Sequence, residues 1–221
     1  SACNDDIPNT LEWLCNHRQR YEEIILGIDW TGGGESNSYT VLAAGGIVRG
    51  TNQVEIAYLE RFPKHISIRE EYTMIMDRIR IICPKLIAHD YGGGGNLREE
   101  LLVQAGIPYE MLLAYTYVCS CNKDICVYNP ITEYKSRSSY SLDKTRSLVV
   151  LCTLTKAKRL VLPNWKASQN IVKDLLHLQM DVLSQVKGSD LHRVIQTPGR
   201  PDDAAHAINY VATTAWSRQN G

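Results

Sequence analysis

Acidic side chains occupy three places in this 221-residue chain where a predicted element of secondary structure ends or begins. Asp29 ends one short apolar run, Asp90 ends another, and Asp202 and Asp203 open the last helical pattern. Carboxylates that are brought together repel one another, so a cluster of them favours a hard divalent cation between them. Two such ions about 4 Å apart can activate a water molecule and stabilise the leaving oxygen of a phosphodiester. The three acidic positions therefore predict metal-dependent phosphodiester hydrolysis.

Glycine-rich segments follow the first two of these acids directly. Residues 32–34 are three glycines after Asp29, and residues 92–95 are four glycines after Asp90. Glycine allows the backbone to approach a phosphate closely or to adopt a positive φ beside a metal. A Walker phosphate loop would end in Gly-Lys-Ser/Thr, and the sequence contains no such triplet. The loops fit a phosphodiester site without a nucleotide-binding P-loop.

Hydrophobic periodicity predicts the elements that must position the acids. Antiparallel strands are expected over 23–30, 39–49 and 53–62, followed by a helix over 67–82 with the capping box Ser67/Glu70. The remaining elements are a strand over 85–91, a helix over 96–105, a strand over 108–117, helices over 142–156, 165–187 and 201–216, and short strands over 159–163 and 191–196; residues 118–141 read as irregular.

This order is that of the ribonuclease H fold, an α/β architecture with a mixed sheet of five or more strands and helices on both faces. The first and fourth strands of that fold are parallel neighbours, so Asp29 and Asp90 would meet at one sheet edge. The final helix would bring Asp202 and Asp203 to the same edge. Actin-like ATPases share this core, so the order of elements alone does not decide the function.

Composition and charge set further bounds. The chain has 24 basic and 24 acidic residues and 44% hydrophobic residues, which indicates a folded domain that does not coat nucleic acid by bulk charge. It has no apolar run of about 20 residues and no signal-peptide pattern, so neither a membrane partner nor secretion is expected. Most of the seven cysteines lie in apolar stretches, which favours a reducing compartment. The missing initiator methionine indicates a piece of a longer protein.

Four blocks of sequence resemble the nuclease domain of the tailed-bacteriophage terminase large subunit. They are residues 27–33 (GIDWTGG), 89–94 (HDYGGG) with 101–108 (LLVQAGIP), and 202–207 (DDAAHA). Residues 140–144 (YSLDK) and 159–165 (RLVLPNW) also resemble that family, and the likeness runs from about residue 23 to 216. The resemblance implies a metal-dependent endonuclease that cleaves concatemeric double-stranded viral DNA during genome packaging.

The resemblance also implies site residues. Asp29, Asp90 and Asp203 correspond to the catalytic carboxylates, which would hold Mg²⁺ or Mn²⁺, two ions in the expected mechanism. Some members carry an aspartate where this chain has His206, so the third metal ligand stays open between Asp203, Asp202 and His206. Asp203 and His206 are three residues apart and share a helical face.

The same resemblance implies an organisation and partners. Residues 1–22 would be a connecting segment from an N-terminal ATPase domain that this chain lacks, and residues 23–221 the nuclease domain. The implied partners are double-stranded DNA, the terminase small subunit and the portal of the procapsid, and the implied location is the host cytoplasm.

A basic stretch with interleaved tyrosines lies between residues 134 and 159. Such a mixture can contact phosphates and stack on bases or sugars, although a solvated helix face explains it equally well. The candidate DNA-binding residues are Lys135, Arg137, Lys144 and Arg146.

Two further sets of potential metal ligands are interpreted as structural residues. Cys119, Cys121 and Cys126 lack the paired spacing of a zinc site. His89 precedes Asp90 and should point to the opposite face of its strand, as a hydrogen-bonding partner in the structure.

Three other functions compete with the terminase reading. A Holliday-junction resolvase or a transposase has the same fold and the same chemistry. An actin-like or sugar-kinase fragment would bind ATP, but those proteins duplicate this core and the chain has no second copy. A non-catalytic docking module would show no metal-dependent cleavage.

Overall fold

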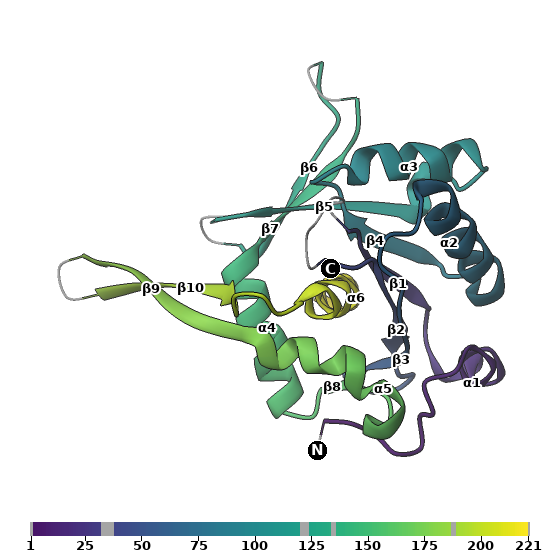
Figure 1. The fold of residues 1–221 in the computed structure, drawn as a ribbon, viewed down its shortest axis with the longest axis horizontal. Helices are drawn as coiled ribbons and strands as arrows, with labels where there is room; N and C mark the ends of the chain where they lie inside the picture. Colours follow the sequence, from purple (N-terminus) through teal and green to yellow (C-terminus); the bar gives the residue numbers. More distant parts are fainter. Residues whose placement is uncertain (1, 32–37, 120–123, 134–135, 187–188, 221) are drawn as a thin grey trace.

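A mixed β-sheet forms the centre of the molecule in a computed structural model that describes residues 2–31, 38–119, 124–133, 136–186 and 189–220 (Figure 1). Within these residues the sheet has eight strands in the order β6-β7-β5-β4-β1-β2-β3-β8, and β9 and β10 form a separate hairpin. The strands are β1 (Ile25–Asp29), β2 (Val41–Ile47), β3 (Val54–Arg61), β4 (Leu86–Asp90), β5 (Leu112–Val118), β6 (Cys126–Asn129), β7 (Ser139–Asp143), β8 (Leu160–Val161), β9 (Leu178–Val186) and β10 (Ser189–Gln196).

The strand directions are those of a ribonuclease H-like fold, as the sequence predicts. β1, β2 and β3 pair in antiparallel succession, and β4 pairs in parallel with β1 on its other side. β5 is parallel to β4, and β7 is parallel to β5. Four neighbouring strands (β1, β4, β5 and β7) therefore run in one direction and end at one edge of the sheet.

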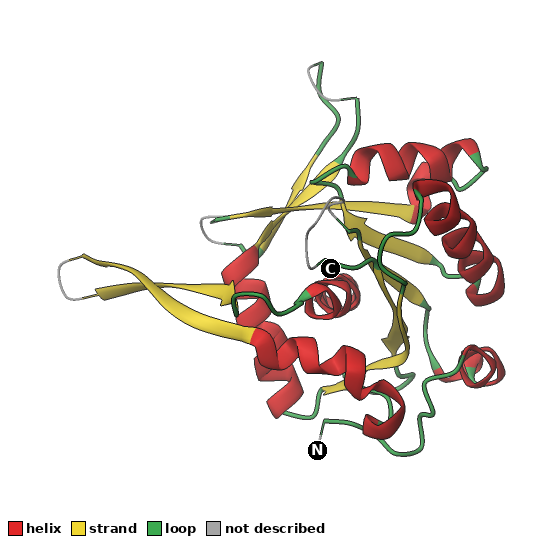
Figure 2. Cartoon of the chain, viewed as in Figure 1, coloured by secondary structure: helices red, strands yellow, loops and turns green. Residues whose placement is uncertain are grey.

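Helices cover both faces of the sheet (Figure 2). One apolar cluster joins the sheet to α4, α5 and α6, and a second joins the opposite face to α1, α2 and α3. The helices are α1 (Leu11–Asn16), α2 (Ile68–Ile82), α3 (Gly95–Gln104), α4 (Lys144–Lys156), α5 (Trp165–Val172) and α6 (Asp203–Asn220), with 3-10 turns η1 (Arg18–Arg20), η2 (Tyr109–Met111) and η3 (Lys173–His177). None of the helices in the described part of the chain is long and apolar enough to cross a membrane.

Two predicted segments differ from the structure. The helix expected over 165–187 is wrong beyond Val172, because the chain turns through η3 and then forms the hairpin of β9 and β10. Apolar and polar residues alternate over 178–182, a period-2 pattern that pairing with β10 turns into a strand. The segment 118–141, read as irregular, contains β6 and the start of β7. Pairing with neighbouring strands stabilises β6 and β7, and the hydrophobic pattern of the segment does not predict such pairing.

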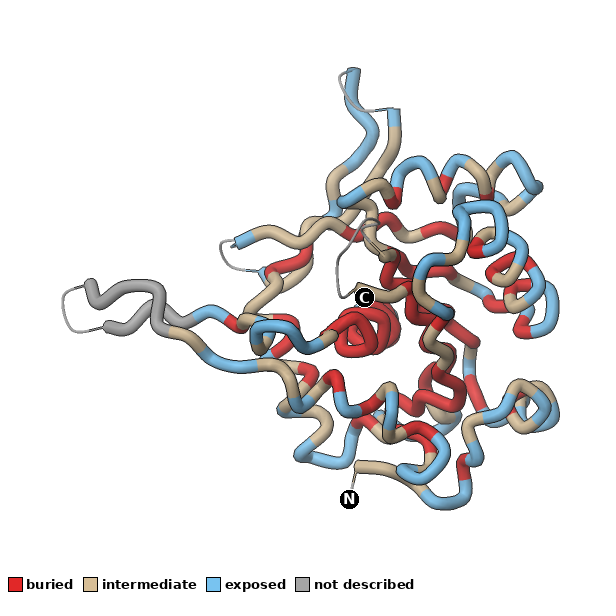
Figure 3. The backbone as a smooth tube through the Cα atoms, viewed as in Figure 1, coloured by how far each residue is buried: buried red, intermediate tan, exposed pale blue. Residues whose placement is uncertain are grey.

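Helix α6 packs closely across β1 and β2 (Figure 3). Every residue from Asp202 to Ala215 is buried, and alanines make up much of this stretch. Gly27 of β1 allows the approach, because a Cβ atom there would collide with the carbonyl oxygen of Ala207 and lie 2.7 Å from Cγ2 of Val211. The small residues on both elements thus set the distance between α6 and the strand that ends in Asp29.

Replacing Gly27 by Ala should destabilise the fold by about 3 kcal/mol, since the added methyl group meets backbone as well as side chain. Urea unfolding followed by circular dichroism measures this difference. The double variant Gly27→Ala/Val211→Ala should remain as unstable, because the collision with the Ala207 carbonyl persists. A full recovery of stability in the double variant would show that the backbone contact does not limit the packing.

Candidate active site

The carboxyl ends of the four parallel strands bring chemistry-bearing residues to one edge of the sheet. Asp29 is the last residue of β1 and Asp90 the last of β4. Tyr117 lies near the end of β5, and Lys144 directly follows β7. This edge is where ligands bind in open α/β sheets generally. The sequence singled out the two acids and Lys144, and the structure adds Tyr117 at the same edge.

Side-chain alternation directs both strand-end acids toward α6. In β1, Ile25 belongs to the cluster on the α6 side and Leu26 to the opposite cluster, so Asp29 shares the side of Ile25 and Gly27. In β4, Ala88 lies on the α6 side, and Asp90 shares that side. The first residue of α6 is Asp203, whose charge, like that of Asp90, acts on Asp29, so acids from three elements influence one another at this edge.

Asp29 is the most strongly perturbed of these acids. Its side chain is buried, with the residue 8% exposed. Burial, and then the negative charges of Asp203, Asp90 and Asp202, raise the pKa of Asp29 well above its ordinary value, whereas the charge of Lys144 opposes the rise. Such a shift by burial and like charges is typical of a functional site.

The two carboxylate oxygens of Asp203 differ in their hydrogen bonding. Its Oδ1 accepts a hydrogen bond of 2.7 Å from the Ser38 hydroxyl, whereas its Oδ2 is buried and has no hydrogen-bond partner among the described residues. Burial raises the pKa of Asp203 despite the bond from Ser38. A buried carboxylate oxygen without a donor is a costly group unless something else binds it.

Asp202 is used differently from its neighbour. Its Oδ2 lies 3.0 Å from Nε2 of His206, one helical turn along α6. The other ring nitrogen of His206 lies 3.1 Å from the Tyr117 hydroxyl, which also accepts from Asn209 at 3.0 Å. Burial disfavours ionisation of Asp202, but the bond and charge of His206 outweigh it and hold the pKa below its ordinary value.

The start of α6 is anchored by a residue that the sequence did not single out. Asp174 of η3 is buried and accepts a hydrogen bond from the backbone N–H of Ala204 at 3.1 Å. The same carboxylate forms an ion pair with Arg61 of β3. An acid at a helix N-terminus is favoured by the helix dipole, so this contact fixes the first turn that carries Asp203. Asp174 and Ser38 come from loops and short turns, where no sequence motif marks them.

The glycines after Asp90 shape a tight turn into α3. Gly93 and Gly94 have φ values of 54° and 95°, the left-handed region that favours glycine. A Cβ atom on Gly95 would collide with the carbonyl oxygen of Asp90. The Asp90 carboxylate accepts from the backbone N–H of Gly92 at 3.0 Å, which fixes its orientation. The glycines at 32–34 lie outside the described residues.

Comparison with known proteins gives structural matches only. No protein-family model and no curated protein matches the sequence. The nuclease domain of the large terminase subunit gp2 of bacterial virus Sf6 superposes with a TM-score of 0.54 at 11% identity, over 90% of this chain and 95% of that chain. The human cytomegalovirus terminase nuclease domain, Mn-soaked and inhibitor-bound, gives 0.52 at 14% identity over 97% and 95%. The bacteriophage SPP1 large terminase nuclease domain, with bound Mn, gives 0.50 at 13% identity over 91% and 89%.

The chain has the fold of terminase nuclease domains. The likeness spans nearly the whole of each chain, and at these identities it is a likeness of fold. It confirms the fold expected from the sequence blocks at 27–33, 89–94 and 202–207.

The candidate DNA-binding residues of this terminase-like domain are dispersed. Lys144 lies at the carboxylate edge, with its Nζ 5.5 Å from the centre of the Tyr117 ring. Arg146 donates to the carbonyl oxygen of Asp124 at 3.1 Å, near the surface. Arg137 lies away from the edge in an ion pair with Glu99. Lys135 is outside the described residues.

His89 has the structural role that its strand position predicts. It is fully buried on the face opposite Asp90, and its Nε2 lies 2.8 Å from a Glu99 oxygen. Its Nδ1 lies 3.3 Å from Nε1 of Trp30. Of the three cysteines weighed for zinc, Cys119 is exposed, Cys126 is half-buried in β6, and Cys121 is outside the described residues.

The donor set fits a hard divalent cation. Among the described residues no three acidic, histidine or cysteine side chains already converge on one point as ligands. Ser38 holds one oxygen of Asp203, and Gly92 holds one oxygen of Asp90. Aspartate oxygens are the ligands that Mg²⁺ and Mn²⁺ prefer, and Asp203 keeps one buried oxygen, Oδ2, without a hydrogen-bond partner among the described residues.

Replacing Asp29 by Asn should stabilise the metal-free protein at neutral pH. Because the folded-state pKa of Asp29 lies above its unfolded value, its ionisation opposes folding as pH rises above about 4. Denaturant unfolding in EDTA at neutral pH should give the variant a higher free energy of unfolding than the wild type. The gain should vanish at pH values below about 4, where Asp29 is protonated in both states.

The exposed Asp77→Asn change is the matched control, because it removes the same charge from a solvated site. It should alter the free energy of unfolding little at either pH. A less stable Asp29→Asn variant at neutral pH would contradict the repulsion inferred for the carboxylate cluster.

Proposed function

We propose that this chain is the metal-dependent endonuclease domain of a viral DNA-packaging terminase, which cleaves double-stranded concatemeric DNA by two-metal phosphodiester hydrolysis. The observation that carries the proposal is the meeting of Asp29, Asp90 and Asp203 at the carboxyl edge of a terminase-like nuclease fold. The Mn present in similar nuclease domains supports Mg²⁺ or Mn²⁺ as the cofactor.

The three aspartates would hold the ions. When bound there, two divalent ions supply an activated water and stabilise the leaving oxygen of the phosphodiester. Asp203 is favoured over Asp202 as the third ligand, because Asp203 keeps a buried oxygen free while Asp202 is bonded to His206. Asp202 and His206 then act as positioning residues that hold the first turn of α6 against Tyr117.

Lys144 supplies positive charge at the point where phosphate would enter. It is half-buried as the first residue of α4, and its charge acts on both Asp29 and Asp202. A cation fixed beside the reacting phosphate stabilises negative charge that develops in the transition state. Arg146 would contact the DNA backbone, as would Lys135, which lies outside the described residues, and Arg137, whose charge Glu99 offsets, would support the fold.

The setting that we propose follows from the same likeness. Residues 1–22 would connect residues 23–221 to an ATPase domain, and the complex with the small subunit and the portal would act in the host cytoplasm. Isolated from that assembly, a domain with balanced overall charge should hold DNA weakly.

Asp29→Asn and Asp203→Asn should each abolish nicking of supercoiled plasmid in Mn²⁺, because each removes a charged ligand. Asp202→Asn should retain cleavage, reduced about tenfold, since it weakens only the support from His206. Agarose gel analysis of purified proteins with matched thermal unfolding measures these effects. Wild-type levels of cleavage by Asp29→Asn would refute the proposed site, and a preference for branched over linear duplex would identify a resolvase instead.

Lys144→Met should lower kcat about a hundredfold with little change in KM, because the charge acts on the transition state. Lys156→Met is the control, because it removes the same charge from an exposed position at the other end of α4, and its kcat should equal that of the wild type. Initial rates on a fluorescent duplex over a range of DNA concentrations separate the two constants. A raised KM with unchanged kcat for Lys144→Met would show that Lys144 contributes to DNA binding and not to stabilisation of the transition state.

A further inference from the structure

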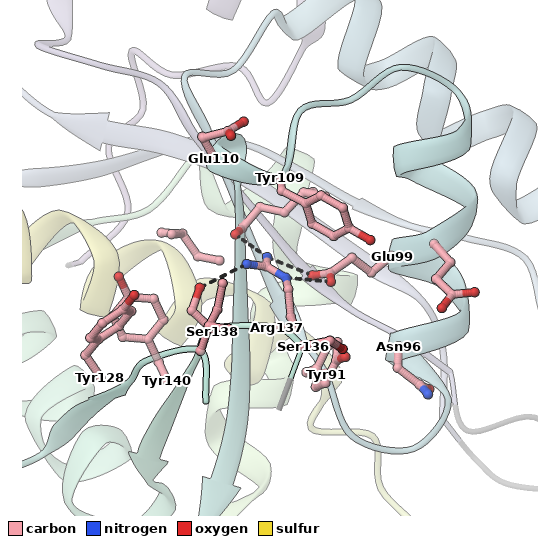
Figure 4. A pocket seen from close by; sticks show the side chains of 14 residues that line it. Tyr91, Asn96, Glu99, Tyr109, Glu110, Tyr128, Ser136, Arg137, Ser138 and Tyr140 are labelled. Atoms are coloured by element: carbon pink, nitrogen blue, oxygen red, sulfur yellow. Dashed lines mark hydrogen bonds and ion pairs between the residues drawn. The ribbon is translucent and has the colours of Figure 1, made fainter. Parts of the chain in front are cut away.

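A cavity of about 490 Å³ lies beside α3 and η2, where β5, β6 and the residues before β7 come together (Figure 4). None of the three catalytic aspartates lines it. Four tyrosines contribute to its walls, and acidic residues of α3 and η2 stand among them. The tyrosines are Tyr91, Tyr109, Tyr128 and Tyr140.

The walls already bind a guanidinium group. The guanidinium of Arg137 lies 5.1 Å from the centre of the Tyr109 ring, within the range of a cation–π contact. Tyr109 is 45% exposed and Tyr128 is 55% exposed, so both also present ring surface to an incoming group. Aromatic faces of this kind attract cations and planar groups.

The positive charge of Arg137 is neutralised by contacts within the protein. Its Nε and Nη2 donate to the two oxygens of Glu99 at 2.8 and 3.1 Å, and Nη2 also donates to the Leu112 carbonyl. A further bond of 3.3 Å joins Nη1 to Ser138. Arg137 and Glu99 together contribute no net charge to the cavity.

The remaining charges among the described lining residues are negative. Glu100 and Glu110 are exposed, and neither forms an ion pair within the part of the chain that the structure describes. Burial and then the charge of Glu99 raise the pKa of Tyr91, and Glu100 adds to the rise. A cavity with two carboxylates that have no ion-pair partner among the described residues repels the phosphates of DNA and attracts a cation.

We infer that this cavity binds an arginine side chain presented by a basic segment of a partner protein. The guanidinium would stack on the free tyrosine faces while Glu100 and Glu110 attract its charge. Arginine suits the site better than lysine, because its planar group stacks on aromatic rings and is more weakly hydrated. The inference concerns protein recognition and does not depend on the proposed cleavage.

A fluorescein-labelled tetra-arginine peptide tests the inference with the full 221-residue chain in EDTA, so that no cleavage chemistry contributes. Fluorescence anisotropy at low salt should show saturable binding, and tetra-lysine should bind more weakly. The Glu100→Gln/Glu110→Gln variant should weaken tetra-arginine binding about tenfold, a loss of about 1.4 kcal/mol. Tyr128→Ala should weaken it as well, because a stacking face is lost.

The matched control is Glu12→Gln/Glu22→Gln, which removes two exposed charges from another part of the surface. It should change the dissociation constant less than twofold, and Asp29→Asn should bind the peptide like the wild type. The inference fails if no saturable binding occurs, if the control weakens binding as much as the cavity variant, or if Asp29→Asn weakens it. It also fails if a fluorescent single-stranded oligonucleotide binds the wild type in the same assay and Tyr128→Ala weakens that binding, which would indicate base stacking in the cavity instead.

Discussion

The close packing of α6 on β1 is the constraint on which the candidate site depends. Asp203 is the first residue of α6, so its distance from Asp29 is set by how near the helix lies to the strand. Gly27 permits that approach against the Ala207 carbonyl. Asp174 then fixes the start of the helix through the Ala204 N–H. A bulkier strand or a free helix end would separate the carboxylates and leave no cluster to bind a cation.

This packing brings together carboxylates that repel one another. Contacts from neighbouring residues offset part of the electrostatic repulsion. Ser38 donates to Asp203, Gly92 donates to Asp90, and His206 pairs with Asp202. The pKa of Asp29 rises well above its ordinary value, and the charge of Lys144 opposes this rise. Burial of the apolar clusters on both faces of the sheet therefore stabilises the fold against the repulsion between these acids. Such local strain is expected where function requires preorganised charge.

Sequence reasoning located the parts of the site that follow from strand ends and failed where pairing decides the structure. Asp29 and Asp90 could be predicted because short apolar runs end in them and parallel neighbours end at one edge. Strand β9 of the hairpin was missed, since its residues also fit a helical pattern until β10, a strand that the sequence predicted over 191–196, pairs with them. Ser38 and Asp174 were missed because a hydrogen bond across 165 residues, or to the start of a helix 30 residues away, leaves no local pattern.

Successive side chains of β4 point to opposite faces of the sheet, so the strand contributes to two different chemical environments. Asp90 faces α6 and the carboxylates, whereas His89 faces α3 and bonds to Glu99, which in turn holds Arg137 at the tyrosine-lined cavity. Both environments therefore share one strand and one tight glycine turn. Because Glu99 bonds to both the buried His89 and the half-buried Arg137, this chain of contacts supports β4 from the side opposite the carboxylates. Glu99 and Arg137, which line the cavity, thus also support the strand that presents Asp90.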